Sequence, residues 1–135
     1  MAIHGKNTVF SIDDVGGSLR EISQYCDDVD FPGVNADVTE CSGFGQKSKS
    51  YVAGQLTGTI TINGKWNATA DLYLNGIVGE EGSFEYGPEG KTALDIKYSG
   101  ECICTGYNTK SPLDGTATFT ATFQITGDVT RGAYT

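Results

Sequence analysis

The sequence contains a single histidine, His4, and this scarcity limits the catalytic chemistry that it can support. A Ser–His or Cys–His nucleophile needs a positioned imidazole, and His4 stands close to the N-terminus. Zinc sites favour cysteines two to four residues apart combined with histidines, whereas Cys102 and Cys104 are separated by one residue. Acidic residues are numerous, but no spacing selects a glycosidase pair. The sequence therefore predicts no enzyme, no metal site and no cofactor.

Long apolar runs are also missing. No stretch approaches the roughly 18 apolar residues of a membrane span, and residues 1–7 lack the apolar core of a secretory signal. We therefore expect folding in a cytosol, where thiols stay reduced. A disulfide and a zinc site remain the alternatives for the four cysteines, which are Cys26, Cys41, Cys102 and Cys104.

Basic residues are few, with 9 lysines and arginines against 17 acidic residues and a formal charge of −8. Phosphate binding needs cations, so a protein that coats nucleic acid is excluded. The charge is concentrated, because residues 13–40 carry eight acidic residues against Arg20 alone. This segment is either a solvated surface that aids solubility or a surface whose negative potential is used.

Proline is scarce, at 3, but glycine is abundant, at 19 of 135 residues, without a collagen period. Such glycines are typical of turns and strand ends, and the length fits one domain over residues 1–135. Apolar residues alternate with threonine from residue 56 to 66 and from 116 to 125, which predicts two half-buried strands. In the first of these, Leu56 and Trp66 share the phase of the buried residues Ile60 and Ile62.

Three further segments read as strands. Residues 9–12 precede a turn at 13–17, and residues 94–98 continue toward Cys102 and Cys104, which we expect to share a core face. Between residues 19 and 31 the alternation places two sets of side chains on opposite faces. One set is Tyr25, Val29 and Phe31; the other is Cys26, Asp28 and Asp30.

The remaining segments predict one helix and two connections. Asn67 or Thr69 can cap a helix that Gly79 ends, with Leu72, Tyr73, Ile77 and Val78 as its apolar stripe. Residues 31–51 read as a long connection of the kind that is usually functional, and residues 80–90 as an acidic loop. The expected fold is mainly β, a sandwich or barrel-like domain with one flanking α-helix.

The order of several segments resembles the major tail tube proteins of tailed bacteriophages. These segments are GKNTVFSIDD (5–14), LREISQY (19–25), VDFP (29–32), GFGQKSKSYVAG (43–54), ITINGKW (60–66) and GTATFTATFQITGDV (115–129). The resemblance covers nearly the whole chain, and its specificity lies in the order of the pieces, because Thr-rich alternating strands are common.

The resemblance implies a structural virion protein, without catalysis, that forms hexameric rings stacked into a hollow tail tube. It implies that one sheet of each subunit lines the lumen and that the long loop reaches adjacent rings. Partners would be further copies of the chain and other tail proteins at the tube ends, with no membrane involved. Viral DNA would pass as unbound cargo, and assembly would take place in the host bacterial cytoplasm.

On this basis Asp28 and Asp30 are the candidate lumen-facing residues, because carboxylates repel DNA phosphates. The candidate inter-ring loop residues are Gly43, Phe44, Lys47, Lys49 and Tyr51.

Two other functions stay open. A standalone β-sandwich module for a carbohydrate or surface ligand would be a monomer with Trp66 exposed as a platform. A virion decoration or sheath-associated protein would assemble without forming a hollow ring.

Overall fold

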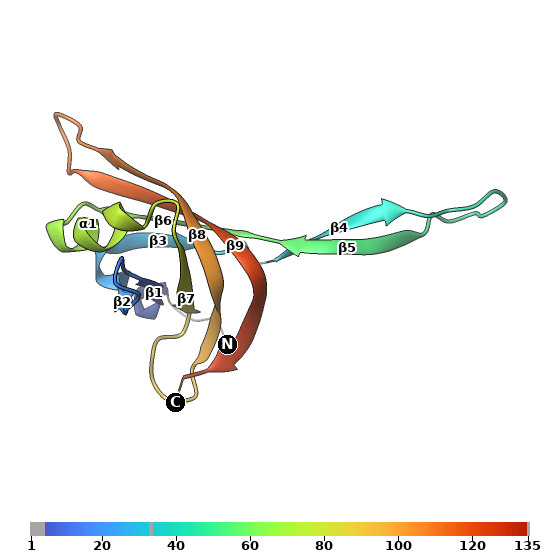
Figure 1. The fold of residues 1–135 in the computed structure, drawn as a ribbon, viewed down its shortest axis with the longest axis horizontal. Coiled ribbons are helices and arrows are strands. Elements are labelled where there is room, and N and C mark those ends of the chain that lie inside the picture. The colour runs from blue at the N-terminus through green and yellow to red at the C-terminus, as the bar shows by residue number, and fades with distance from the viewer. Residues whose placement is uncertain (1–4, 33, 135) are drawn as a thin grey trace.

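The computed structural model describes residues 5–32 and 34–134, so the predictions made for His4 lie outside it. The fold is mainly β, with 56% of residues in strands and 12% in helices (Figure 1). The strands are β1 (Val9–Asp13), β2 (Leu19–Glu21), β3 (Cys26–Asp30), β4 (Asn35–Glu40), β5 (Tyr51–Thr57), β6 (Thr59–Lys65), β7 (Glu81–Gly87), β8 (Ile96–Lys110) and β9 (Thr118–Ala133). The helical segments are α1 (Ala68–Leu74) and three 3₁₀ turns, η1 (Gly5–Asn7), η2 (Ser23–Tyr25) and η3 (Asn75–Ile77).

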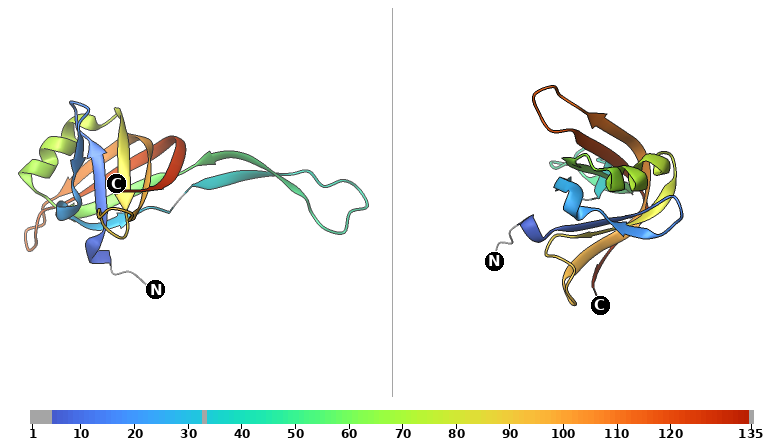
Figure 2. Two further views of the ribbon diagram at one scale, coloured as in Figure 1. Left: turned by 90° about the horizontal axis from the view of Figure 1, so that it is seen from below. Right: turned by 90° about the vertical axis from the view of Figure 1, so that its left-hand side faces the viewer.

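Seven strands form one antiparallel sheet in the order β2-β1-β7-β8-β9-β6-β3, and β4 pairs only with β5. The sheet is strongly curled (Figure 2). Phe31, which follows the edge strand β3, stacks on Tyr86 of β7 and Tyr98 of β8 at centroid distances of 5.4 and 5.7 Å. Because β3 is four strands away from β7 in the sheet order, this contact can form only across the core. The predicted barrel-like domain with one flanking helix is confirmed.

The core lies inside this curled sheet and is built by the alternation that the sequence shows. Even-numbered residues of β6 and odd-numbered residues of β9 point inward, with Ile60, Ile62 and Phe123 fully buried. Cys102 and Cys104 share the core face of β8, each 1% exposed, as predicted. The other fully buried large side chains are Phe10, Ile12, Ile22, Leu74, Phe84 and Phe119.

The expected strand through residues 56–66 is wrong at both ends. Leu56 belongs to β5, which leaves the body of the protein, and β6 begins only after Gly58. Trp66 follows the last residue of β6 and precedes α1, so it lies beyond the sheet and is 42% exposed. The interpretation of Trp66 as a core residue is therefore incorrect.

The face assignment of β3 holds for its aspartates but not for Cys26. A register shift between Cys26 and Asp28 in the β3–β6 pairing inserts one residue, so Cys26 packs against the core. Val29 also packs inward, whereas Asp28 and Asp30 are exposed, as predicted.

Two segments near β7 and β8 also differ from expectation. Residues 80–90 were expected to be a loop, but 81–87 form β7, whose Phe84 is fully buried. The sequence of β7 is rich in glutamate and glycine, and only one of its side chains is large, apolar and buried. It therefore shows no alternating apolar pattern that would predict a strand. Leu94 was expected in the next strand, yet it has φ of +75°, is exposed and precedes β8.

The helix begins as predicted, with the side chain of Asn67 accepting a hydrogen bond from the Thr69 amide, and Gly79 has φ of +85° beyond η3. Its buried face was predicted correctly for Ile77, which is buried, and for Tyr73, which packs against the core, but not for Leu72 and Val78. Residues three or four apart share a helix face, and the buried set is Ala70, Leu74 and Ile77. Leu72 and Val78 are consequently exposed.

Residues 31–51 are not a continuous irregular connection. They contain β4, which pairs with β5, so that only residues 41–50 form the turn of a long hairpin. We call residues 34–57 the arm, which projects from the body of the protein along its longest axis (Figures 1 and 2). No helix within the described residues is long and apolar enough to cross a membrane.

Candidate assembly surfaces

The solvent side of the large sheet carries hydroxyls, amides and carboxylates instead of apolar side chains. The strand registers align these outward-facing residues in rows across β3, β6, β9, β8 and β7. We call this surface the polar face. Its members are Asp28, Asp30, Thr59, Thr61, Asn63, Ser83, Glu101, Thr118, Thr120, Thr122, Gln124 and Thr126, and Ile103 is an aliphatic residue among them.

Hydrogen bonds between side chains tie the rows of the polar face together. The hydroxyl of Thr120 donates to Oδ1 of Asn63 at 2.8 Å, and Nδ2 of Asn63 points to Oδ2 of Asp28 at 3.5 Å. On the β7 side, the hydroxyl of Ser83 donates to Oε1 of Glu101 at 2.8 Å. These contacts occupy the side chains with one another and so fix their positions.

Besides the carboxylates of Asp28, Asp30 and Glu101, the polar face carries Lys65 and Lys110, which flank Thr118 in one row. Lys65 pairs with Asp27 at 3.3 Å, and Lys97 pairs with Glu85 at 3.7 Å. Asp28, Asp30 and Glu101 take part in none of the ion pairs formed between residues in the described part of the chain. A phosphate approaching the part of this face around Asp28, Asp30 and Glu101 would therefore meet carboxylates and neutral hydroxyls, and it would meet Lys110 only at the end of β8.

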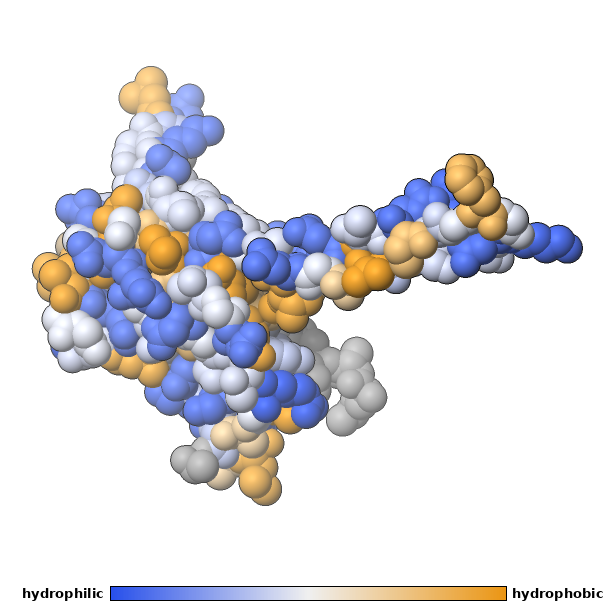
Figure 3. Space-filling model, turned by 45° about the vertical axis from the view of Figure 1, so that its right-hand side comes forward, coloured by the Kyte–Doolittle hydropathy of each residue, from blue (hydrophilic) through white to orange (hydrophobic). Residues whose placement is uncertain are grey.

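The arm exposes apolar side chains on both of its faces. Val38 lies opposite Ala53, and Tyr51 and Leu56 lie on the same face, because a register shift between Ala36 and Val38 reverses the phase of β5; Val52 projects from the other face. Every residue of β4 and β5 is exposed, and apolar groups line the arm in Figure 3. An isolated two-stranded hairpin is marginally stable in water, so this arm needs a surface to cover it.

The tip of the arm brings together the predicted inter-ring residues. Gly43 donates its amide to the side chain of Gln46, and Gly45, with φ of +87°, completes the turn. Phe44 is fully exposed here, and Lys47 and Lys49 lie in the same turn without a carboxylate partner among the described ion pairs. Tyr51 lies at the start of β5. The structure thus groups these five residues on one protruding element.

An aromatic cluster fixes the other end of the arm. Phe31 stacks on Tyr86 and Tyr98, and its ring also lies 6.1 Å from that of Phe84. Burial, together with the neighbouring Tyr98 and the Asp30 carboxylate, raises the pKa of Tyr86, so its phenol stays neutral. Phe31 precedes the arm by three residues, so the cluster determines where the arm leaves the body.

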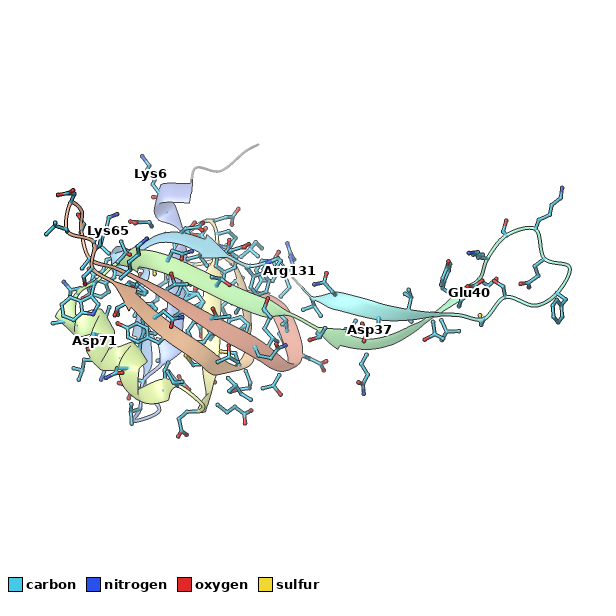
Figure 4. The ribbon with its side chains drawn as sticks, turned by 90° about the horizontal axis from the view of Figure 1, so that it is seen from above. Lys6, Asp37, Glu40, Lys65, Asp71 and Arg131 are labelled. Carbon is cyan, nitrogen blue, oxygen red and sulfur yellow. The ribbon has the colours of Figure 1, made fainter. Side chains whose placement is uncertain are left out.

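The helix end of the body is held by two polar contacts. Arg20 donates to Asp14 at 2.8 Å and lies over the ring of Tyr73, and this hydrogen bond lowers the pKa of Asp14. The Tyr107 hydroxyl donates to Asp71 of α1 at 2.8 Å; burial first, and then this bond, raise the pKa of Tyr107. Figure 4 shows Asp71 and Lys65 at this end, with Asp37 and Glu40 on the arm.

The cysteines do not form a reactive site. Burial raises the pKa of Cys26 and Cys102 to about 12 and also raises that of Cys104, so these thiols stay protonated. Cys41 is exposed at the far end of β4. Within residues 5–32 and 34–134, no group of three or more potential metal ligands lies together.

The polar face as a whole was not identified from the sequence, which singled out only Asp28 and Asp30. The threonine alternation in 56–61 and 116–122 was the available signal, since residues opposite a buried set must share the outer face. Ser83 and Glu101 could not be assigned to it, because β7 was not recognised as a strand.

Comparisons with known proteins identify the fold. No family model and no curated protein matches the chain. A chain from the tail of an empty gene transfer agent particle, refined with C6 symmetry, is 15% identical with a TM-score of 0.76, covering 98% of this chain and 100% of that chain. The SPP1 tail tube protein is 12% identical with a TM-score of 0.70, covering 98% and 80%. A chain of the sheath–tube complex of an extracellular contractile injection system is 17% identical with a TM-score of 0.69, covering 98% and 92%.

These similarities extend over the whole body and the arm. The chain therefore has the tail tube fold, and the resemblance noted in the sequence is confirmed at the level of the fold.

Proposed function

We propose that this chain is the building block of a viral tail tube, a non-catalytic virion protein that assembles with further copies of itself. The proposal rests on one observation: the chain has a tail tube fold that combines a long exposed arm with a polar sheet face. The arm requires a neighbour, and the polar face suits a surface that stays in contact with water.

The arm supports self-assembly through its unsatisfied surface. Val38, Tyr51 and Leu56 lie on one face and Val52 on the other, so contact with a single flat surface would leave Val52 exposed. A segment clamped between two neighbouring copies buries both faces. We therefore assign Gly43, Phe44, Lys47, Lys49 and Tyr51 to contacts between stacked rings.

The polar face supports a lumen wall. DNA binds proteins largely through phosphate contacts with lysine and arginine, and most of this wall consists of hydroxyls and carboxylates, with Lys65 and Lys110 confined to the row of Thr118. Asp28 and Asp30, without a cation partner among the described residues, keep the potential negative at the edge strand β3. DNA would pass along such a wall as unbound cargo.

The C6 symmetry of the gene transfer agent tail supports rings of six copies for this chain. Stacked rings would form a single hollow tube, with other tail proteins at its ends. The tube would belong to the virion and assemble in the host cytoplasm as one domain, residues 1–135, carrying an arm.

Electron microscopy of the purified protein tests the proposal directly. We expect rings or hollow tubes with sixfold averages at high protein concentration. Strictly monomeric protein at every concentration, with an arm that is equally protected from hydrogen exchange under all conditions, would refute a tube role.

The lumen assignment has its own test. Replacing Asp28 and Asp30 with lysine should make assembled tubes retain double-stranded DNA and slow genome ejection, with retention falling as salt rises. The matched control is Asp114→Lys, at the β8–β9 turn and away from the polar face. Normal ejection in the double variant would move the lumen to another surface.

One observation favours a second candidate, a binding module for a carbohydrate or another surface ligand. Trp66 is 42% exposed, as such a module requires. However, Trp66 lines neither the cavity between the β1–β2 turn and η3 nor the one beside β3 and η1. A monomer on size-exclusion chromatography whose Trp66 fluorescence shifts with an added oligosaccharide would favour this candidate over the tube.

A further inference from the structure

A cavity of about 240 Å³ opens between the β1–β2 turn, η3 and the start of β7. Its inner lining comes from the core and includes Ile12, Cys102 and Phe123, so it is apolar. Its rim carries Asp13, Asp14, Glu80 and Glu81. The cavity thus combines an apolar floor with a ring of carboxylates.

The rim is not neutralised by the protein's own cations. Arg20 pairs with Asp14 alone, and Asp13 accepts one hydrogen bond, from the amide of Ser83 at 2.9 Å. Glu80 and Glu81 take part in none of the ion pairs between residues 5–32 and 34–134. Glu81 lies opposite Ile103, so its side chain belongs to the polar face. The carboxylates of Asp13 and Glu80 therefore remain at the rim, and a lysine that lays its aliphatic stem on the floor would satisfy both parts of the site.

The tip of the arm has the complementary chemistry. Residues 41–50 contain Lys47 and Lys49 and no acidic residue, and Phe44 adds a fully exposed apolar side chain beside them. Its lysines, like the rim, lack partners among the described ion pairs.

The two surfaces cannot meet within one molecule. The arm leaves the body at one end of the long axis, whereas the β1–β2 turn and α1–η3 lie at the opposite end in both views (Figures 1 and 2). A projection at one end and a complementary cavity at the other produce a head-to-tail contact between copies, which closes into a ring or propagates as a stack.

From this arrangement we propose that the cavity rimmed by Asp13 and Glu80 receives the basic arm tip of a second copy of this chain. Lys47 or Lys49 of that copy enters the cavity and places its ammonium among the carboxylates. The inference rests on the proposed tube role and deepens it, because it names the surface to which the arm binds.

Charge reversal provides the test. We expect Lys47→Glu/Lys49→Glu and Glu80→Lys each to raise the protein concentration needed for tube formation at least tenfold. An equimolar mixture of the two variants should recover tube formation, because the acidic arm tip of one variant fits the basic cavity of the other and the unchanged basic arm fits the unchanged cavity. The variant in which every copy carries all the reversals should also recover most of the loss. Lys91→Glu and Asp114→Lys, both exposed and outside the arm tip and the cavity, serve as controls.

A covalent readout covers the case in which a variant folds poorly. In a Cys41→Ser background, Lys47→Cys protein mixed with Glu80→Cys protein should form a 47–80 disulfide on mild oxidation, identified by mass spectrometry. Lys47→Cys mixed with Asp114→Cys should not cross-link.

The outcomes separate the two proposals. Tubes from the wild-type chain, combined with unaffected assembly of the charge-reversal variants and no 47–80 cross-link, overturn the cavity as the arm's binding site and leave the tube role standing. Failure of the wild-type chain to form any assembly overturns the tube role and, with it, this contact.

Discussion

Truncation of Phe31 tests how the arm is attached to the body. The ring of Phe31 contacts three aromatic side chains, at 5.4 Å from Tyr86, 5.7 Å from Tyr98 and 6.1 Å from Phe84. Truncating a fully buried phenylalanine costs about 3–5 kcal/mol, so the half-buried Phe31 should lose about 1.5 kcal/mol, half of the lower limit. Three lost ring pairs, at the lower limit of about 0.5 kcal/mol each, bring the expected destabilisation of Phe31→Ala to roughly 3 kcal/mol.

The assay is urea unfolding of the monomer, followed by the fluorescence of Trp66, the single tryptophan of the chain. In thermal unfolding, the same loss of roughly 3 kcal/mol corresponds to a melting temperature lower by about 10 °C for a domain of this size. Phe31→Leu should lose about half as much, because the apolar area is largely kept while the ring pairs are removed.

Phe44→Ala is the matched control, since it makes the same chemical change at the fully exposed arm tip. It should change the free energy of unfolding by less than about 0.5 kcal/mol, as exposed sites do, yet impair tube assembly. A loss below about 1 kcal/mol for Phe31→Ala, with an unchanged urea dependence, would refute the idea that this cluster anchors the arm.

Three further predictions concern the body. Gly64→Ala should unfold the protein or cost more than about 3 kcal/mol, measured by thermal melting. The added Cβ would lie 2.8 Å from the Cα of Cys26 and closer still to the carbonyl oxygen of Tyr25. Stability equal to wild type would contradict the close approach of β3 to β6. Asn67→Ala should cost about 1 kcal/mol in urea unfolding through loss of the N-cap of α1, whereas Asn75→Ala, at the other end of the helix, should cost less. Alkylation at pH 8 should label Cys41 rapidly but Cys102 and Cys104 only on unfolding, because burial raises the pKa of both of these thiols. Rapid labelling of all the cysteines in the native protein would show that the core around β8 opens readily.

The parts of the fold that the sequence predicts are those where one face of a strand is buried and the other solvated. Ile60 and Ile62 in β6, and Phe119 and Phe123 in β9, alternate with threonines because the core lies on one side only. β4 and β5 produce no such signal, since both faces are exposed in the single chain. The strand pattern of the arm depends on surfaces of other molecules, which a one-chain periodicity cannot reveal.

Other differences arise from local irregularities. The register shift at Cys26 reverses the face of one residue, and no residue type in CDDVD marks it. Trp66 keeps the alternation of β6 but follows its last residue, so its phase no longer determines its burial. The same limit applies to the candidate site residues. The sequence places Asp28 and Asp30 on the correct face of β3, but it cannot show which residues lie beside them on the polar face, because that depends on pairing with β6 and β9.

The structure also changes the meaning of the acidic segment 13–40. Its charges do not form one surface, because Asp14 is engaged by Arg20 and Asp27 by Lys65. The others separate into the cavity rim, with Asp13, and the polar face, with Asp28 and Asp30, while Asp37 and Glu40 lie on the arm. A solubility role would require only net charge, wherever it lies. Separation into a face that repels phosphate and a rim that fits a basic arm makes the same residues act in two different contacts, so neutralising each group should affect DNA passage and assembly independently.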